Sequence, residues 1–428
     1  MVNTNKKYKM KLQKFNITII SLLLTSFIAK AQNYQFNFSD ADKKGFIKIS
    51  ENTVFGENSA YGFDLETKRE GNKPYCFSAI IPEGNYQVTV LLGNKSQTTN
   101  TTIKAESRRF MLENVETPKG KFVQKTFNVN IRNKIISGTD TVKTKPRELL
   151  KLNWDNKITF EINGINPGLV EMKIKPINVP TIFLAGNSTV VDQDNEPWCG
   201  WGQILPRFLN SKVAVANYAE SGEASNTFVS SKRFAKLISK LKKGDYVFIE
   251  FGHNDEKQKG SAFTTFKTNM KYLVDKTREK GGIPVLITPM HRRKFDENGK
   301  IINTHGDYPN AVRELAKEEK VYLIDLNSYS QTLYEAWGDE NSKKAFVHYP
   351  AGTYPGQKEA LADNTHFNTY GGYEICKCIL KGILENNLPL KKYIVKDFKG
   401  FNPAKPDEIE SVKVPPTPFS STLKPDGN

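Results

Sequence analysis

Three polar side chains in the C-terminal part of the sequence, Ser188, Asp363 and His366, have the types and spacing of a nucleophilic triad. Ser188 directly follows the apolar run 181–185, so its hydroxyl should lie at the end of a strand. Asp363 precedes His366 by three positions, and in a loop this places a carboxylate on one ring nitrogen while the other takes a proton from serine. Each residue alone has an ordinary explanation, because Ser commonly caps helices and a surface His often has an incidental Asp nearby.

Two further segments could donate hydrogen bonds to an oxyanion, the charged oxygen formed when a hydroxyl attacks a carbonyl. Asn254, within segment 251–255, has a side-chain amide that can donate to such an oxygen. Gly222, at the end of segment 217–222, lets a backbone N–H approach a substrate closely. Each segment alone is an ordinary turn.

A repeating pattern after residue 181 predicts the element that positions these side chains. Amphipathic stretches, including 227–241, 263–280 and 370–385, alternate with apolar runs, which are 181–185, 213–219, 246–252, 283–289 and 321–326. Such runs are typical of a parallel sheet covered on both faces, and five units fit a flavodoxin-like doubly wound α/β domain. The loops beyond the carboxyl ends of its strands should then converge at one edge. Asp363 and His366 are expected in the loop before the last helix.

The sequence before this domain has a different period. Residues 86–90, 127–131 and 158–162 alternate apolar and polar side chains, with turn signals between them and no long helical pattern. We expect residues 32–178 to form a smaller antiparallel β-sandwich. The α/β domain should then span 181–395. Residues 396–428 are rich in Pro, Lys and Asp and should form a loosely packed tail.

Taken together, the motifs resemble the four conserved blocks of the SGNH (GDSL) hydrolases, most closely those of bacterial rhamnogalacturonan acetylesterases. The segments that carry this resemblance are Gly186-Asn187-Ser188, Gly222, Gly252-His253-Asn254-Asp255 and Asp363-x-x-His366. Segments 198–203, 292–295 and 305–309 are also similar to those esterases, and the resemblance covers 181–386. The β-sandwich resembles galactose-binding-like modules. Asn187 stands where the lipase-type motif has Asp, which argues against a lipase.

The resemblance implies a serine carboxylic-ester hydrolase that requires no cofactor and no metal. Ser188 would be the nucleophile, His366 the base, and Asp363 the group that orients the imidazole. The backbone N–H groups of Ser188 and Gly222 and the side chain of Asn254 would form the oxyanion hole. Weaker candidates could bind substrate by stacking on a sugar or by holding a carboxylate, and these are Trp198, Trp201, His291, Arg292 and Arg293. Aromatic residues at a helix start are more often packed, and a solvated basic patch explains the basic residues at least as well. The pair Arg108-Arg109 has no assignable role.

The N-terminus has the pattern of a secretory signal peptide, expected to span 1–31. Five lysines precede the apolar run 17–28, and Ala29-Lys30-Ala31 offers a cleavage site. We therefore expect export to the periplasm or medium, without a membrane anchor. The four cysteines could then form disulfides, although Cys376 and Cys378 diverge on a helix.

The sequence carries 62 Lys and Arg against 46 Asp and Glu, a net charge of +16. In an exported protein this charge favours an acidic plant cell-wall polysaccharide as partner over nucleic acid, unless it serves only solubility. The oligomeric state is not indicated. The preferred hypothesis is an enzyme that removes O-acetyl groups from a pectic polysaccharide, rhamnogalacturonan. Alternatives are the same chemistry on another ester, such as acetylated xylan or a lipid, and a non-catalytic carbohydrate-binding protein. The complete set of Ser, His and Asp counts against the last.

Overall fold

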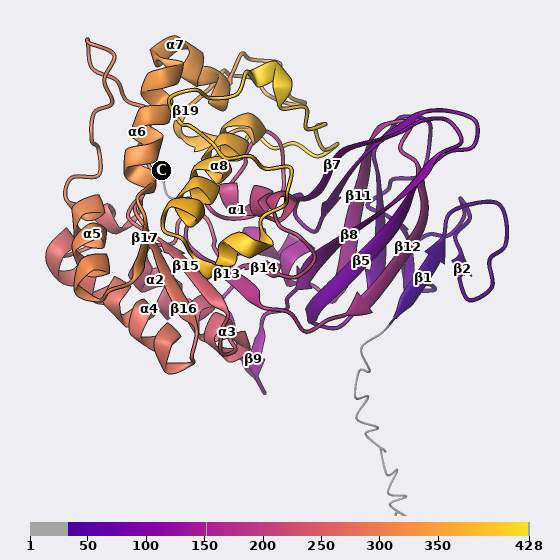
Figure 1. Ribbon diagram of the computed structural model, residues 1–428, viewed down its shortest axis with the longest axis horizontal. Helices are drawn as coiled ribbons and strands as arrows, with labels where there is room; N and C mark the ends of the chain where they lie inside the picture. The colour runs from indigo at the N-terminus through magenta and orange to yellow at the C-terminus, as the bar shows by residue number, and fades with distance from the viewer. Residues whose placement is uncertain (1–32, 151, 427–428) are drawn as a thin grey trace, which may run out of the picture. The chain divides into compact units, whose positions relative to one another are not determined.

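Two five-stranded sheets form the N-terminal part of the computed structural model, which describes residues 33–150 and 152–426 (Figure 1). Their strand orders are β2-β1-β12-β5-β8 and β3-β4-β11-β6-β7, and all strand pairs except β1–β2 are antiparallel. The strands are β1 (Tyr34–Asn37), β2 (Ile47–Lys48), β3 (Tyr61–Asp64), β4 (Tyr75–Ile80), β5 (Gly84–Gly93), β6 (Thr99–Ala105), β7 (Arg109–Thr117), β8 (Phe122–Ile131), β11 (Lys157–Ile165) and β12 (Leu169–Pro176). The predicted antiparallel β-sandwich is confirmed.

Period-two alternation explains why these segments form strands with one buried face. In β5, Tyr86, Val88, Val90 and Leu92 are buried, and most residues between them are only half-buried. A small hairpin of β9 (Ile135–Ser137) and β10 (Asp140–Thr141) follows, before the 3-10 helices η1 (Pro146–Leu150) and η2 (Leu152–Trp154).

A five-stranded parallel sheet, of order β14-β13-β15-β16-β17, forms the next part of the chain. This is the flavodoxin-like order that the five apolar runs predicted. Its strands are β13 (Thr181–Ala185), β14 (Ala214–Asn217), β15 (Tyr246–Glu250), β16 (Ile283–Ile287) and β17 (Tyr322–Ile324). Every residue of β13 and β15 is buried, as expected for strands covered on both faces.

Helices connect and cover these strands (Figure 1). They are α1 (Trp201–Ile204), α2 (Ser225–Ser230), α3 (Arg233–Lys240), α4 (Lys267–Glu279), α5 (Tyr308–Glu318), α6 (Leu326–Trp337), α7 (Asp339–Ser342) and α8 (Thr369–Glu385). The stretch 227–241 was expected to be one helix but is two, because Lys232 has a left-handed backbone with φ of 64°. The stretch 263–280 begins with a π-helical turn, Ala262–Phe266, before α4.

The segment of Asp363 and His366 differs from the sequence prediction. They lie within a strand, β19 (Leu361–Phe367), which pairs antiparallel with β18 (Phe346–Tyr349). Val347 pairs with Asp363 and the preceding Phe346 pairs with Phe367, so residues 364–366 form a bulge in the ladder. A bulge re-aims side chains, and it places His366 out of the regular alternation.

The C-terminal segment is not a loose tail, and that prediction is wrong for residues 415–421. The carbonyl of Pro415 accepts a hydrogen bond from Lys104, the Thr417 hydroxyl donates to Glu161, and Ser420 forms a β-bridge with Glu196. The segment is ordered because it satisfies polar groups that are buried between the sandwich and the parallel sheet. Composition alone does not reveal such partners.

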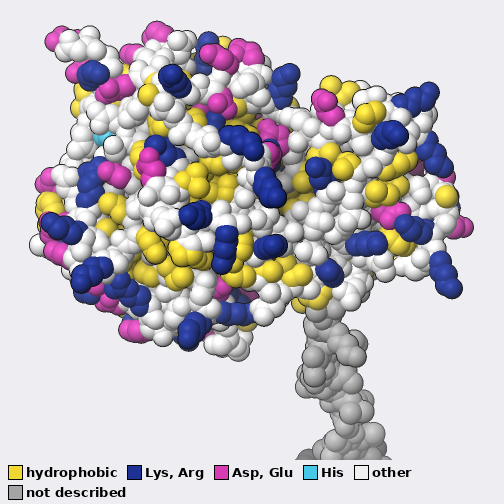
Figure 2. Space-filling view, in the orientation of Figure 1, with side chains coloured by type: hydrophobic (Ala, Val, Ile, Leu, Met, Phe, Trp, Pro, Cys, Tyr) yellow, Lys and Arg dark blue, Asp and Glu magenta, His cyan; other side chains and the backbone are white. Residues whose placement is uncertain are grey.

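Several other expectations concern the surface and the termini. The predicted signal peptide lies outside the described residues, and among those described no helix is long and apolar enough to cross a bilayer. Figure 2 shows Lys and Arg side chains spread over the visible face, interspersed with acidic ones.

All four cysteines are buried and unpaired, and burial raises the pKa of Cys76 and Cys199 to about 12.

Candidate active site

Ser188 lies in a tight turn that directly follows β13. The amides of Val190 and Val191 both donate to the carbonyl of Asn187, at 3.1 and 3.0 Å, and close one helical turn around the serine. The turn cannot accept a side chain at Gly186, because a Cβ there would lie 2.6 Å from Cγ2 of Val190. The sequence Gly-Asn-Ser thus fixes the nucleophile candidate at the carboxyl edge of the sheet.

The structure brings Ser188, His366 and Asp363 into one hydrogen-bonded chain. Nε2 of His366 lies 2.8 Å from Oγ of Ser188, and Nδ1 lies 2.9 Å from Oδ2 of Asp363. All three side chains are buried. Since an ionised carboxylate only accepts hydrogen bonds, Nδ1 carries the proton and Nε2 is free to accept the serine proton. This is the arrangement that activates a serine as a nucleophile.

Asp363 is held in its ionised form. Burial opposes ionisation, but hydrogen bonds from the His366 ring and from the amides of Thr365 and His366 outweigh it and lower the pKa of Asp363 below its usual range. The same Oδ1 atom accepts both amides, at 2.7 and 2.9 Å. The carboxylate therefore cannot rotate away from the imidazole.

The two other predicted oxyanion donors lie on neighbouring loops of the same sheet edge. Gly222 follows β14 with φ of +79°, a conformation that favours glycine. Asn254 follows β15, and its side-chain amide donates to the carbonyl of Glu223 at 3.0 Å, which leaves its second N–H available. Gly252 is required here, because a Cβ would lie 2.6 Å from Cγ of Pro289.

The sandwich supports the loop that follows Ser188, through two residues to which the sequence assigned no role. Nε of Arg109 donates to Oδ2 of the fully buried Asp192 at 2.6 Å. Arg108 donates to the carbonyl of Trp198 at 2.7 Å and forms an ion pair with Glu196 at 2.5 Å. No local motif marks these pairs, since their members lie more than 80 positions apart. Charged residues beside strand ends were the only available signal.

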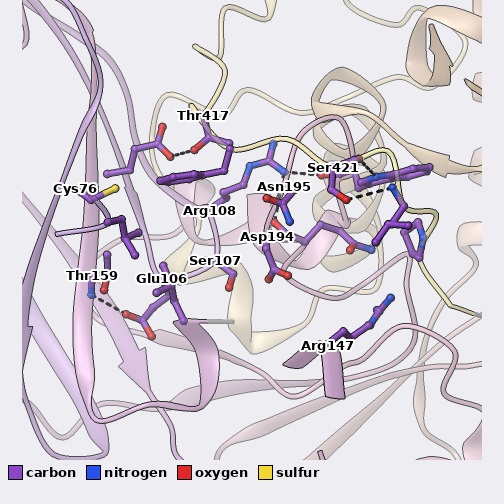
Figure 3. Close-up of a pocket in the computed structure, with 18 of the residues that line it drawn as sticks. Cys76, Glu106, Ser107, Arg108, Arg147, Thr159, Asp194, Asn195, Thr417 and Ser421 are labelled. Atoms are coloured by element: carbon purple, nitrogen blue, oxygen red, sulfur yellow. Dashed lines mark hydrogen bonds between the residues drawn. The ribbon is translucent and has the colours of Figure 1, made fainter. Parts of the chain in front are cut away.

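A pocket of about 620 Å³ opens beside this loop (Figure 3). Its walls come from the turn 106–108 of the sandwich, from the loop 193–198, and from the C-terminal segment 417–426. Gln193 and Trp198 connect the pocket to the triad. The Gln193 amide donates to the carbonyl of Ser188 at 2.9 Å, and the Trp198 ring packs edge-on against His366 at 5.7 Å.

The two predicted sugar-stacking tryptophans have different surroundings. Trp198 lines the pocket, although its ring is mostly buried and its Nε1 donates to the carbonyl of Ser421. Trp201 is fully buried in the core and donates from Nε1 to Glu250 at 2.7 Å. The prediction that Trp201 binds substrate is therefore wrong, because its ring has no accessible face. Burial also raises the pKa of Glu250 to about 8.

The structure does not bring His291, Arg292 and Arg293 to the pocket lining. Arg292 forms an ion pair with Glu256 at 2.5 Å, and Arg293 with Asp339. Arg293 also donates to the side chain of Asn364, beside Asp363, at 3.1 Å. His291 is buried, which lowers its pKa to about 4. Because none of these three residues lines the pocket, the structure does not support the predicted grip on a substrate carboxylate.

His253, in the third motif, is also a buried neutral residue. Burial lowers the pKa of His253 well below its ordinary value, and the electrostatic effect of His305 lowers it further. The rings of His253 and His305 pack edge to face, with their centroids 4.4 Å apart. Among the described residues neither ring nitrogen of His253 has a hydrogen-bond partner. We assign it a packing role beneath the Asn254 turn. The described residues contain no group of His, Cys, Asp and Glu that could hold a metal ion.

Comparison with known proteins agrees with the geometry. Residues 184–371 match the GDSL-like Lipase/Acylhydrolase family. The chain is 42% identical to rhamnogalacturonan acetylesterase RhgT of Bacillus subtilis (strain 168) over 227 residues, 52% of this chain and 97% of that protein. It is 36% identical to the probable rhamnogalacturonan acetylesterase YesY of the same organism over 222 residues, 50% of this chain and 98% of that one. The crystal structure of B. subtilis protein YxiM is 24% identical, with a TM-score of 0.47, covering 84% of this chain and 99% of that one. The family match and the two relatives at 42% and 36% identity show that the chain belongs to the GDSL-like lipase/acylhydrolase (SGNH hydrolase) family and is an esterase.

Proposed function

We propose that this esterase removes O-acetyl groups from a pectic polysaccharide of the rhamnogalacturonan type, through an acetyl-enzyme on Ser188. The single observation that carries the mechanism is the continuous hydrogen-bonded chain from Asp363 through His366 to Ser188. The substrate part of the proposal rests on two relatives, one named a rhamnogalacturonan acetylesterase at 42% identity and one named a probable rhamnogalacturonan acetylesterase at 36% identity.

Acylation begins when Oγ of Ser188 attacks the acetyl carbonyl carbon while Nε2 of His366 takes the hydroxyl proton. Asp363 stabilises the imidazolium without taking the proton itself. The negative charge on the carbonyl oxygen is met by the backbone N–H groups of Ser188 and Gly222 and the side-chain amide of Asn254. One such donor contributes about 3–4 kcal/mol to transition-state stabilisation.

Collapse of this intermediate breaks the bond between the acetyl carbon and the sugar oxygen, and the His366 imidazolium returns its proton to that oxygen. The deacetylated polymer leaves, and the acetyl group remains on Ser188. A water molecule then attacks the acetyl-enzyme, with His366 again accepting the proton, and acetate is released. The pocket beside Trp198 is the space next to the triad that we propose for sugar units flanking the ester.

We also propose that the protein is exported to the periplasm or medium, where a cell-wall polymer would be available. The positive N-terminus, short apolar run and small-residue cleavage site support this proposal. Cell fractionation with mass analysis of the mature N-terminus tests it, and an intact Met1 on a cytoplasmic protein would reject it.

Acetate release from acetylated rhamnogalacturonan and from acetylated xylan tests the function. The wild type is compared with Ser188→Ala and with Ser328→Ala, an exposed serine on α6 that serves as the control. We expect release from the pectic polymer that is lost in Ser188→Ala and kept in Ser328→Ala. A preference for xylan would retain the mechanism and reject the pectic assignment. Release unaffected by Ser188→Ala, or none from either polymer, would reject the catalytic proposal.

A further inference from the structure

Two cationic side chains from the N-terminal part of the chain border the loop of Gly222. Lys145 directly precedes η1 and Arg147 lies within it. Nζ of Lys145 donates to the carbonyl of Ser221 at 2.5 Å, and Nη2 of Arg147 donates to Glu220 at 2.8 Å. Nζ of Lys145 lies 3.0 Å from the position that a Cβ on Gly222 would take. Nζ of Lys145 also lies 3.5 Å from Oε1 of the buried Glu223. Both cations are next to a proposed oxyanion donor, and both stay partly exposed to solvent.

The chain's own Asp426 occupies this cationic pair. Its Oδ2 lies 3.7 Å from Nζ of Lys145, and its Oδ1 lies 3.5 Å from Nη1 of Arg147. Its Cβ is 2.9 Å from where a Cβ on Gly222 would be. The carboxylate of Asp426 thus lies against the loop of Gly222, between the cations of Lys145 and Arg147. The described residues place a carboxylate beside one of the proposed oxyanion donors.

The segment that carries Asp426 is held in two different ways along its length. Up to Ser421 it is anchored, because Thr417 is buried and Trp198 donates to the carbonyl of Ser421 at 2.8 Å. Beyond that point Leu423 is 80% exposed and Asp426 is exposed, while Pro425 is buried against the pocket. Nζ of Lys424 lies 3.4 Å from Oδ2 of the buried Asp363. Ion pairs between solvent-exposed side chains add little to stability, so the contacts of Asp426 with Lys145 and Arg147 can be exchanged for those of another carboxylate.

The cationic pair and the adjoining pocket also have unused hydrogen-bond donors. Nε of Arg147 is buried without a hydrogen-bond partner among the described residues, and the same holds for Oγ of Ser107 and Nε of Arg108. All three residues line the pocket, Arg147 on the side away from Cys76 and Thr159 (Figure 3). Guanidinium and hydroxyl donors suit the carboxylate and hydroxyl oxygens of a uronic acid unit.

We propose that Lys145 and Arg147 form a carboxylate subsite that Asp426 fills in the free protein and a uronate unit of the substrate fills during turnover. Residues 422–426 are then an internal competitor that leaves when the anionic polymer binds. This inference rests on the proposed function. It explains why the enzyme would prefer an anionic polymer to a neutral one. It assigns part of the substrate site to the N-terminal part of the chain.

Kinetics on two polymers test the subsite. Arg147→Gln and Lys145→Gln should raise KM for acetylated rhamnogalacturonan about ten- to a hundredfold, and the KM for neutral acetylated xylan by a much smaller factor. Asp426→Asn, and a chain ending at Ser421, should lower KM for the anionic polymer. Arg278→Gln, on the exposed surface of α4, is the matched control and should leave both polymers unaffected. Equal KM changes on the two polymers, or a higher KM after removal of 422–428, would overturn the proposal.

Binding without turnover separates this inference from the proposed function. Unacetylated oligogalacturonate can be titrated into Ser188→Ala by calorimetry, with and without Asp426→Asn. Tighter binding in the double variant, lost at high salt, supports the subsite even if neither polymer releases acetate. Binding that is unchanged by Asp426→Asn and by Arg147→Gln would reject the subsite even if Ser188 proves to be the nucleophile.

Discussion

The parallel sheet and the β-sandwich both contribute charged, buried residues near Ser188, but they contribute different things. At the sheet edge, His366 joins Asp363 to Ser188 through contacts of 2.9 and 2.8 Å, so these charges can move a proton. From the sandwich, Arg109 reaches Asp192 at 2.6 Å, and this pair holds a loop without contacting a reacting atom. Burial and charge alone therefore do not distinguish a catalytic residue from a supporting one. What distinguishes the sheet edge is a titratable base between an acid and a nucleophile.

Asp363→Asn should produce the largest effect if the sheet edge carries the chemistry. The amide cannot accept the Nδ1 proton as the carboxylate does, so it stabilises the wrong tautomer of His366. We expect kcat to fall about 10⁴-fold with little change in fold. Steady-state acetate release measures the loss, and circular dichroism checks the fold. A fall of less than tenfold would place Asp363 outside the catalytic chain.

Arg109→Met should affect stability and not chemistry if the sandwich only supports the loop. The substitution removes the nearest cation from the buried Asp192 and leaves it Arg132 at 3.9 Å and the Asn217 amide at 2.7 Å. We expect a cost of about 3 kcal/mol in the free energy of unfolding. Urea denaturation measures it. Lys73→Met, which breaks an exposed pair with Glu70, is the control and should cost less than about 1 kcal/mol. A large loss of kcat without a loss of stability would erase the distinction between the two regions.

Asn254→Ala tests the sheet edge a second time. Losing one oxyanion donor should lower kcat about 10²–10³-fold and leave KM nearly unchanged, because the hydrogen bond forms chiefly in the transition state. The amide also donates to the carbonyl of Glu223, so a thermal melt must accompany the kinetics. A raised KM at unchanged kcat would instead indicate a role in substrate binding.

Glu106→Gln should have the smallest effect, on the pH dependence of stability. Burial raises the pKa of Glu106 from 4.5 to about 8, so between these values the folded state binds more protons than the unfolded state. Stability from this group is present below pH 4.5 and is lost as the pH rises towards 8. The variant should therefore lose less melting temperature than the wild type between pH 5 and pH 8. Equal losses in both proteins would show that Glu106 does not titrate there.

Sequence reasoning succeeded where local pattern determines the outcome. The alternation in 86–90 predicted β5, and the apolar runs predicted the sheet order. The short motifs predicted a triad, and the structure places Ser188, His366 and Asp363 in hydrogen-bond contact, while their catalytic role stays a prediction. It failed where distant contacts decide. The register of β18 against β19 creates the bulge that carries His366, and the surrounding core buries Trp201. The anchoring of residues 415–421 depends on partners such as Lys104, 311 positions away. Contacts between residues so far apart leave no periodic pattern in the sequence from which they could be predicted.

Covalent labelling tests directly whether Ser188 is the nucleophile. The protein is treated with a small sulfonyl fluoride, acetate release is followed as the adduct forms, and the modified peptide is mapped by mass spectrometry. We predict one adduct on Ser188, formed in proportion to the loss of activity and far more slowly in His366→Ala. Full modification of Ser188 with acetate release intact, or inactivation with the adduct on another residue, would show that Ser188 is not the catalytic nucleophile.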